Sequence, residues 1–534
     1  MRLKSELFSF KEAAEWASKY LDREVTPTNI SYLVQYAKIR KYYDEQNKVK
    51  VDKGELRDYY DQNIIKKQEA WKKSLGKDLN WALSFDQLRE ADTTKHVHRL
   101  HPYKGKFIPQ LVEYFLDNRV NKFKKEAFFK EGDIILDPFL GSGTTIIQAS
   151  ELGMHSIGID VSEFNCLISK VKSDDYNTLE LDHILKDALS KMIGFSNKTF
   201  DEKFETELKE RLSEFNEKYF PNPEFKYKIK EGKINEEEYA DEKLKQFLEE
   251  NKAFLNRNGA NDKATLLGEN SIPGFITKWF SKRIKQELFF YLKLTESMKD
   301  EKIRNAMRVI LSRTARSCRA TTHSDLATLK EPQEGPYYCS KHRKICTPIN
   351  TIIKHLRRNT YDTVKRLKTY SNLKKKAYSS IIHGDSRSAD IFEIVKSENP
   401  ELYKILERQK IAGVFTSPPY VGQIDYHEQH AYAYELFSIP RKDEKEIGPL
   451  SRGNGKQARD EYVEGISKVL LNISRFVKDD GDFFIVANDK YNLYPFIAEK
   501  SNLKIVNQFK RPVLNRTERD RQPYAEIIFH MKKV

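Results

Sequence analysis

The segment DIILDPFLGSGTTIIQA, residues 133–149, contains the pattern that decides the fold of this chain. Residues 133–137 predict a short buried strand, and residues 146–149 begin a helix after a turn with two glycines. Gly141 and Gly143 permit positive φ angles and let a ligand approach the backbone. A strand, a glycine turn and a helix in this order form the first unit of a doubly wound sheet. We therefore expect an α/β fold.

The glycine turn differs from two common nucleotide-binding motifs. A Walker phosphate loop needs Gly-Lys-Ser/Thr, and Thr144 occupies the position of its lysine, which argues against a nucleotide triphosphatase. A dinucleotide site needs the third glycine of Gly-x-Gly-x-x-Gly, and this glycine is missing. The next expected strand, residues 156–160, ends in Asp160, and an acid at that position accepts hydrogen bonds from ribose hydroxyls. The pattern favours a smaller nucleoside cofactor.

A second informative segment is FTSPPY, residues 415–420, after the apolar run 411–414 that predicts another buried strand. Its two prolines cannot donate to a sheet ladder, so they end the strand. Ser417 then offers a hydroxyl and Tyr420 a flat aromatic face at the strand's carboxyl end, where open α/β sheets bind ligands. These groups suit a planar base with an exocyclic amine. Taken alone, the segment fits a Pro-Pro turn beside a core tyrosine equally well.

Together, residues 137–145 and 416–420 resemble the cofactor loop and the catalytic loop of S-adenosylmethionine-dependent DNA amino-methyltransferases. Residues 104–109 resemble the family's segment for the cofactor carboxylate, and the likeness spans residues 94–172 and 380–534. It implies a Rossmann-like methyltransferase fold with a mostly parallel mixed sheet. The catalytic residues that it implies are Ser417, Pro418, Pro419 and Tyr420. The cofactor-binding residues that it implies are Lys106, Phe107, Asp137, Phe139, Gly141, Gly143, Thr144, Asp160 and Asp385.

The resemblance implies methyl transfer from S-adenosylmethionine to the exocyclic N4 amine of cytosine in duplex DNA. Ser-Pro-Pro-Tyr, in place of Asp- or Asn-Pro-Pro-Tyr, is similar to the N4-cytosine branch. The expected context is a restriction-modification or related defence system with a cognate restriction endonuclease as partner. Three alternatives stay open: the same reaction on adenine N6, an RNA substrate, and a non-catalytic DNA-binding regulator. A Pro-Cys nucleophile is absent, which argues against C5-cytosine chemistry.

Composition is typical of a soluble protein with a polyanionic partner. The 534 residues carry a net charge of +15, and such a basic balance favours nucleic acid. No apolar run is long enough to span a bilayer, and the first residues include no apolar signal-peptide core. Four cysteines fit a reducing compartment rather than a disulfide scaffold. We expect a cytoplasmic, DNA-associated protein of prokaryotic type.

Four segments are expected along the chain. Residues 1–65, with two short helices, a strand and a third helix, resemble small winged helix-turn-helix domains of the excisionase and MerR kind, or form a helical packing module. Residues 66–175 are a linker and the first part of the methyltransferase domain. Residues 176–378 are too long for a loop, so we expect a large, mainly helical insertion for target recognition. Residues 379–534 complete the methyltransferase domain.

The insertion also contains a candidate metal site. Cys339, His342 and Cys346 form a Cys-x2-His-x3-Cys pattern, and Cys318 could supply a fourth ligand to structural zinc. The spacing lacks the second paired half of common zinc motifs, so buried or free thiols are the alternative. Basic runs at residues 304–319 and 354–376 fit phosphate contacts, or else solvated helix faces.

Overall fold

The centre of the molecule is a seven-stranded sheet in the spatial order β11-β12-β10-β9-β4-β5-β8. In this computed structural model the described residues are 6–21, 25–75, 78–85, 88, 90–121, 123–200, 202–260, 274–323, 329–513 and 524–534. The strands are β4 (Ile134–Asp137), β5 (His155–Asp160), β8 (Ser379–His383), β9 (Ile411–Thr416), β10 (Val477–Ala487), β11 (Leu503–Pro512) and β12 (Ala525–Lys533). Strand β12 runs antiparallel to both of its neighbours, β10 and β11, and the other pairs in the sheet are parallel. The expected mostly parallel mixed sheet is confirmed.

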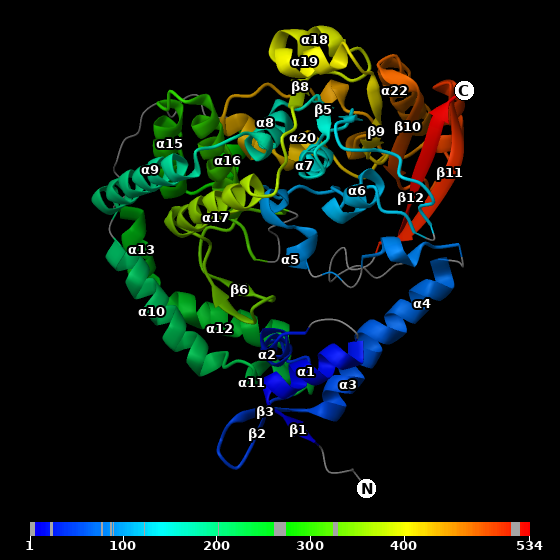
Figure 1. Ribbon diagram of the computed structural model, residues 1–534. Helices are drawn as coiled ribbons and strands as arrows, with labels where there is room; N and C mark the ends of the chain where they lie inside the picture. The colour runs from blue at the N-terminus through cyan, green and yellow to red at the C-terminus, as the bar shows by residue number, and fades with distance from the viewer. Residues whose placement is uncertain are drawn as a thin grey trace.

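Helices cover both faces of the sheet, which explains why its central strands are buried and mostly apolar. All residues of β4 and β9 are buried, as expected for parallel strands packed on both sides. The helices on one face are α18 (Ile391–Glu398), α19 (Pro400–Leu406), α22 (Lys456–Ser474) and α23 (Tyr494–Lys500). Those on the other face are α6 (Pro109–Leu116) and α7 (Thr144–Glu151) (Figure 1).

The strand order places a ligand crevice between β4 and β9. From β4 the chain continues to β5 and β8 on one side, and then crosses to β9 and β10 on the other. Open α/β sheets bind ligands at such a point, outside the carboxyl ends of the strands. On the other side of β9, Gly413 allows close packing against β10, because a Cβ atom on it would lie 2.3 Å from the Asp482 carbonyl oxygen.

The insertion between β5 and β8 is helical, as expected, and has two parts. One part packs against α8 (Glu163–Ser173) beside the sheet. Its helices are α9 (Thr178–Thr199), α14 (Gly274–Trp279), α15 (Lys282–Glu296), α16 (Glu301–Ser317) and α17 (Ile353–Ser371). The other part, here called the arm, has its own apolar core and extends away from the sheet (Figure 1). The arm comprises α10 (Glu202–Tyr219), α11 (Glu224–Lys230), α12 (Glu236–Glu250), α13 (Lys252–Ala260) and the hairpin of β6 (Tyr337–Cys339) and β7 (Lys344–Cys346).

The N-terminal part is a separate small unit with its own core. It contains β1 (Leu7–Phe8), α1 (Phe10–Leu21), α2 (Pro27–Gln35), β2 (Tyr42–Tyr43), β3 (Val49–Asp52) and α3 (Lys53–Tyr60). The three strands form an antiparallel sheet in the order β1-β3-β2. Thr26 caps α2, as its Thr-Pro start predicts. A short π-helix, Asp61–Ile65, joins this unit to α4 (Lys66–Leu75), which leads towards the sheet (Figure 1). Within the described ranges, no helix is both long and apolar enough to cross a membrane.

Candidate functional site

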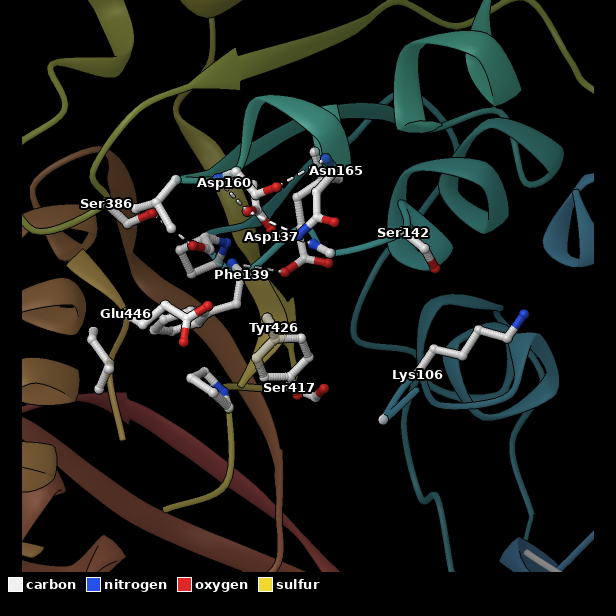
Figure 2. A pocket seen from close by; sticks show the side chains of 18 of the residues that line it. Lys106, Asp137, Phe139, Ser142, Asp160, Asn165, Ser386, Ser417, Tyr426 and Glu446 are labelled. Atoms are coloured by element: carbon white, nitrogen blue, oxygen red, sulfur yellow. Dashed lines mark hydrogen bonds between the residues drawn. The ribbon is translucent and has the colours of Figure 1, made fainter. Parts of the chain in front are cut away.

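A cavity opens where β4, β5, β8 and β9 end, with an empty volume of about 890 Å³ including its mouth. It brings together residues from both predicted motifs, which are far apart in the sequence (Figure 2). The predicted residues that line it are Lys106, Phe107, Asp137, Phe139, Gly141, Thr144, Asp160, Asp385, Ser417 and Pro419.

Asp137 connects the two motifs directly. The Thr416 hydroxyl at the end of β9 donates to Asp137 Oδ1 at 2.6 Å, and the Phe139 N–H donates to the same oxygen at 3.1 Å. The Thr145 hydroxyl also donates to the Phe415 carbonyl at 3.2 Å. Burial raises the pKa of Asp137 to about 6. The glycine turn and the Pro-Pro turn are therefore held at one edge of the sheet.

Asp160 holds the glycine turn from the neighbouring strand. Its Oδ2 accepts the Gly141 N–H at 2.7 Å, while its Oδ1 accepts from the Ser162 N–H at 2.8 Å and from Asn165 Nδ2 at 3.1 Å (Figure 2). Gly141 has a φ of +50°, in the region that favours glycine. Burial raises the pKa of Asp160 to about 6.

Gly143 contributes to packing rather than to the cavity wall. Its φ is +77°, and a Cβ atom there would lie 2.8 Å from the Ser169 hydroxyl of α8. The glycine therefore lets α7 begin close to α8. It is not among the residues that line the cavity.

Asp385 reaches the cavity from the loop after β8. Arg387 donates to its two oxygens at 2.9 and 2.7 Å. Burial raises the pKa of Asp385, but the bonds from Arg387 lower it more, so the net shift is downward. The next residue, Ser386, donates to the Pro138 carbonyl at 2.6 Å and so ties this loop to the glycine turn.

Lys106 lines the cavity, but its ammonium points elsewhere. Nζ donates to the His98 carbonyl, and Figure 2 shows the side chain extending away from the central carboxylates. Burial lowers the pKa of Lys106 to about 8. The ammonium of Lys106 is therefore bound to a backbone carbonyl rather than directed at the carboxylates of the cavity.

The two ends of the Pro-Pro turn have different surroundings. Ser417 and Pro419 line the cavity, whereas Pro418 and Tyr420 do not. The Tyr420 hydroxyl donates to Glu526 of β12 at 3.0 Å. Burial and the nearby Glu526 carboxylate raise the pKa of Tyr420.

Several cavity residues lie outside the predicted cofactor and catalytic sets. Tyr103 and Tyr426 stack with ring centroids 5.8 Å apart. Glu446 accepts the His427 N–H at 2.7 Å, and burial raises the pKa of Glu446 to about 7. Tyr103 adjoins the segment predicted to bind the cofactor carboxylate, so its position was a usable signal. Glu446 lies in a loop without a motif, and only the fold brings it to the site.

The basic runs of the insertion divide into internal and exposed side chains. Arg313 and Arg366 both pair with Asp362, at 2.6 and 2.8 Å. Arg313 therefore joins α16 to Asp362 of α17, whereas Arg366 pairs with Asp362 within α17. The exposed basic side chains of α17 are Lys354, Arg357, Arg358, Lys365 and Lys368.

The candidate metal ligands include one wrong assignment. Cys339, His342 and Cys346 do converge, but the fourth side chain beside them is His323 rather than Cys318. Cys318 follows the last turn of α16 and is fully buried in the apolar core of the insertion. Packing therefore removes this thiol from the cluster.

Comparison with known proteins agrees with this site. The chain is 50% identical to the type II methyltransferase M.MjaII of Methanocaldococcus jannaschii over 526 residues, 98% of this chain and 97% of that protein. It is 37% identical over 100 residues to the type II methyltransferase M.BsoBI of Geobacillus stearothermophilus, 18% of each chain. It is 34% identical over 115 residues to the type II methyltransferase M2.DpnII of Streptococcus pneumoniae, 22% of this chain and 40% of that protein.

The family described as DNA methylase matches residues 6–171, which include the glycine turn and the segment that precedes it. The relative from Methanocaldococcus jannaschii matches almost end to end, so the likeness extends through the insertion and the Pro-Pro turn. The cavity joins the same two motifs on one sheet edge. This chain belongs to the type II DNA methyltransferases.

Proposed function

We propose that this protein transfers a methyl group from S-adenosylmethionine to the exocyclic N4 amine of cytosine in duplex DNA, as the modification enzyme of a restriction-modification system. The observation that carries the proposal is the bond between Thr416 and Asp137, which places Ser417 and Gly141 on the same cavity. A cognate restriction endonuclease is the expected partner, and the expected location is the cytoplasm.

The cavity residues fit S-adenosylmethionine. Asp137, Asp160 and Asp385 line the wall, and carboxylates suit ribose hydroxyls and the adenine amine. Ser142 Oγ and Asn165 Oδ1 are buried without a hydrogen-bond partner in the described part of the chain, so both can serve a polar ligand. When bound there, S-adenosylmethionine supplies an electrophilic sulfonium methyl group. By resemblance to the family, Asp160 holds the ribose and Asp385 the adenine amine.

Ser417 and the turn after it would prepare the cytosine amine. The lone pair of this amine is delocalised into the ring, which makes the nitrogen a poor nucleophile. Hydrogen bonds from the amine to the Ser417 hydroxyl and to a carbonyl beside Pro418 would bend the nitrogen towards a tetrahedral shape and localise the pair. The nitrogen would then form its bond to the methyl carbon as the S–CH3 bond breaks, with the electron pair of that bond left on the sulfur of S-adenosylhomocysteine, and would release one proton to water. The chain's main contribution is positioning.

The target base must leave the duplex to reach Ser417, at a cost of a few kcal/mol. We assign Tyr420 as the ring that stacks on the extruded base, which recovers about 1–3 kcal/mol. The bond from its hydroxyl to Glu526 would hold the ring still for that purpose.

Two exposed surfaces would bind the duplex around the target. The basic side chains of α17 suit phosphate contacts. In the N-terminal unit, proposed as a helix-turn-helix reader, Thr28, Asn29 and Tyr32 are exposed on α2. Arg40 and Lys41 belong to the basic tail after α2, which in such a reader would contact phosphates. In this structure they pair with Glu231 and Glu224 of the arm.

The decisive experiment incubates the purified protein with duplex DNA and methyl-labelled S-adenosylmethionine, and then identifies the labelled nucleoside after digestion. We expect N4-methylcytosine. Ser417→Ala should lower the rate of transfer by about 10²-fold while cofactor binding persists, because Ser417 acts on the amine. Ser397→Ala, at an exposed position on α18, is the matched control and should keep the full rate.

Other products would overturn specific parts of the proposal. Detection of N6-methyladenine would leave the assigned site residues in place and change the target base from cytosine to adenine. In a parallel assay with RNA in place of DNA, label in RNA and none in duplex DNA would make RNA the substrate. Cofactor binding without transfer to any nucleic acid would indicate a regulator that has kept the fold.

A further inference from the structure

The hairpin of the arm and the segment after α16 together carry a second cluster of reactive side chains. None of its four members is among the residues that line the methyltransferase cavity. His323, Cys339, His342 and Cys346 each place one ligand atom within 4.8 Å of the others. His323 comes from the segment after α16, and the other three come from the β6–β7 hairpin. We propose that these four residues bind one structural zinc ion in a Cys2His2 site.

The spacing of the side chains matches tetrahedral zinc. Zn–S bonds of about 2.3 Å and Zn–N bonds of about 2.05 Å at a tetrahedral angle separate a sulfur and a nitrogen ligand by about 3.6 Å. Cys346 Sγ lies 3.6 Å from His342 Nδ1, and Cys339 Sγ lies 3.7 Å from His323 Nδ1. All four cysteines are free thiols. The ligands are thus already at coordination distances, with no disulfide to break.

Neighbouring groups support the ligands. The His342 backbone N–H donates to Cys339 Sγ at 3.4 Å, a contact that stabilises a metal-bound thiolate. The Tyr337 hydroxyl accepts the His323 backbone N–H at 3.0 Å and lies 2.7 Å from His323 Nδ1. Coordination through Nδ1 replaces the second of these contacts, and the first continues to hold the turn that carries His323.

The donor set favours zinc in a structural role. Two thiolates and two imidazoles provide four soft or borderline ligands, which zinc binds tetrahedrally. Four protein ligands leave no position open for water or substrate, so the ion would not take part in catalysis. Cys339 is buried and Cys346 half-buried, as suits a closed site.

The ion would fasten the arm to the rest of the insertion. The β6–β7 hairpin has three residues in each strand, too few to be stable alone. On one side Asn216 of α10 exchanges two hydrogen bonds of 2.9 Å with the Ile345 backbone, and Tyr338 donates to Glu236 of α12 at 2.9 Å. On the other side zinc would join the hairpin to His323, which follows α16 in the chain.

Elemental analysis of the full-length protein, purified without chelators and with a reducing agent, tests this proposal. We expect about one zinc ion per chain. The variants His323→Ala and Cys339→Ser should each retain no more than about a tenth of the metal that the wild-type protein binds. Cys318→Ala should keep it, because that thiol lies in the apolar core. His323→Cys should also retain metal, because it restores a fourth ligand.

Cobalt(II) binding to the wild-type chain provides a readout that does not depend on the folding of any variant. The expected spectrum has intense visible d–d bands of a tetrahedral ion and thiolate charge-transfer bands. Wild-type protein that binds neither zinc nor cobalt would overturn the proposal. Metal that survives His323→Ala but disappears in Cys318→Ala would overturn the assigned ligands. Iron or copper at full stoichiometry would overturn the assignment of zinc.

Discussion

At the scale of single residues, the site depends on carboxylates that each accept a hydrogen bond from another segment. Asp137 accepts from Thr416 across the β4–β9 junction, and Asp160 accepts the Gly141 N–H. A carboxylate that is buried and hydrogen-bonded in this way holds its loop in place before any ligand arrives. Both residues also line the cavity. Thus the residues that organise the loops are also those that would contact the cofactor.

Asp160 should make stability depend on pH. Burial raises its pKa to about 6 in the folded protein, above about 3.9 for an unfolded aspartate. Between these values the folded state binds the proton more tightly, so the free energy of unfolding falls by up to about 3 kcal/mol as pH rises through this window. Asp160→Asn removes this titration. The free energy of unfolding of the variant minus that of wild type should therefore increase from about pH 4 to about pH 7.

Urea titrations of both proteins across this range measure the difference. Asp187→Asn, on the exposed face of α9, is the control for removing a carboxylate. A difference for Asp160→Asn that stays constant with pH would show that Asp160 is ionised to the same extent in both states.

At the scale of elements, the junction of β9 and β10 has no space for a side chain at Gly413. A Cβ atom there would lie 2.3 Å from the Asp482 carbonyl oxygen and 2.7 Å from the Phe129 ring. Gly413→Ala should therefore push the strands apart and lower the free energy of unfolding by about 1–3 kcal/mol. Because β9 ends in Thr416 and Ser417, the same displacement should weaken binding of S-adenosylmethionine. Thermal unfolding and a cofactor titration provide the two measurements.

The matched control is Gly194→Ala in α9, where nothing lies within 4 Å of the added Cβ atom. Alanine in a helix interior is favoured over glycine by about 0.5–1 kcal/mol, so this variant should be more stable than wild type. If both alanine variants changed stability in the same direction, the strand contact at Gly413 would not be the cause.

At the scale of the whole molecule, the N-terminal unit contacts the end of the arm and connects through α4 to the sheet (Figure 1). Lys226 of α11 donates to the Gln35 carbonyl at 2.7 Å, and Tyr227 donates to the Ile39 carbonyl at 3.1 Å. The ion pairs of Arg40 with Glu231 and of Lys41 with Glu224 lie beside them. Exposed ion pairs contribute little, so the hydrogen bonds to backbone carbonyls should dominate this contact.

The double variant Lys226→Ala, Tyr227→Phe should release the N-terminal unit from the arm. We expect the free energy of the contact between the two parts to weaken by about 1–3 kcal/mol. Amide exchange in the segment after α2 should therefore become faster, while binding of S-adenosylmethionine should not change. The control is Lys245→Ala, which removes an exposed pair with Asp241 on α12. Unchanged exchange in the double variant would mean that other contacts hold the two parts together.

Local sequence was sufficient for the strands, the glycine turn, the Pro-Pro turn and the helical nature of the insertion, because these depend on short-range dihedral preferences and periodicity. Ten of the cavity residues came from the resemblance to DNA amino-methyltransferases, which rests chiefly on the glycine turn, the Pro-Pro turn and residues 104–109. Local sequence could not reveal Glu446 in the cavity, the orientation of Lys106, or His323 in place of Cys318. Those positions depend on contacts between segments far apart in the chain. The core of the insertion buries Cys318, so the fourth side chain of the Cys/His cluster is His323, which no local spacing pattern marks.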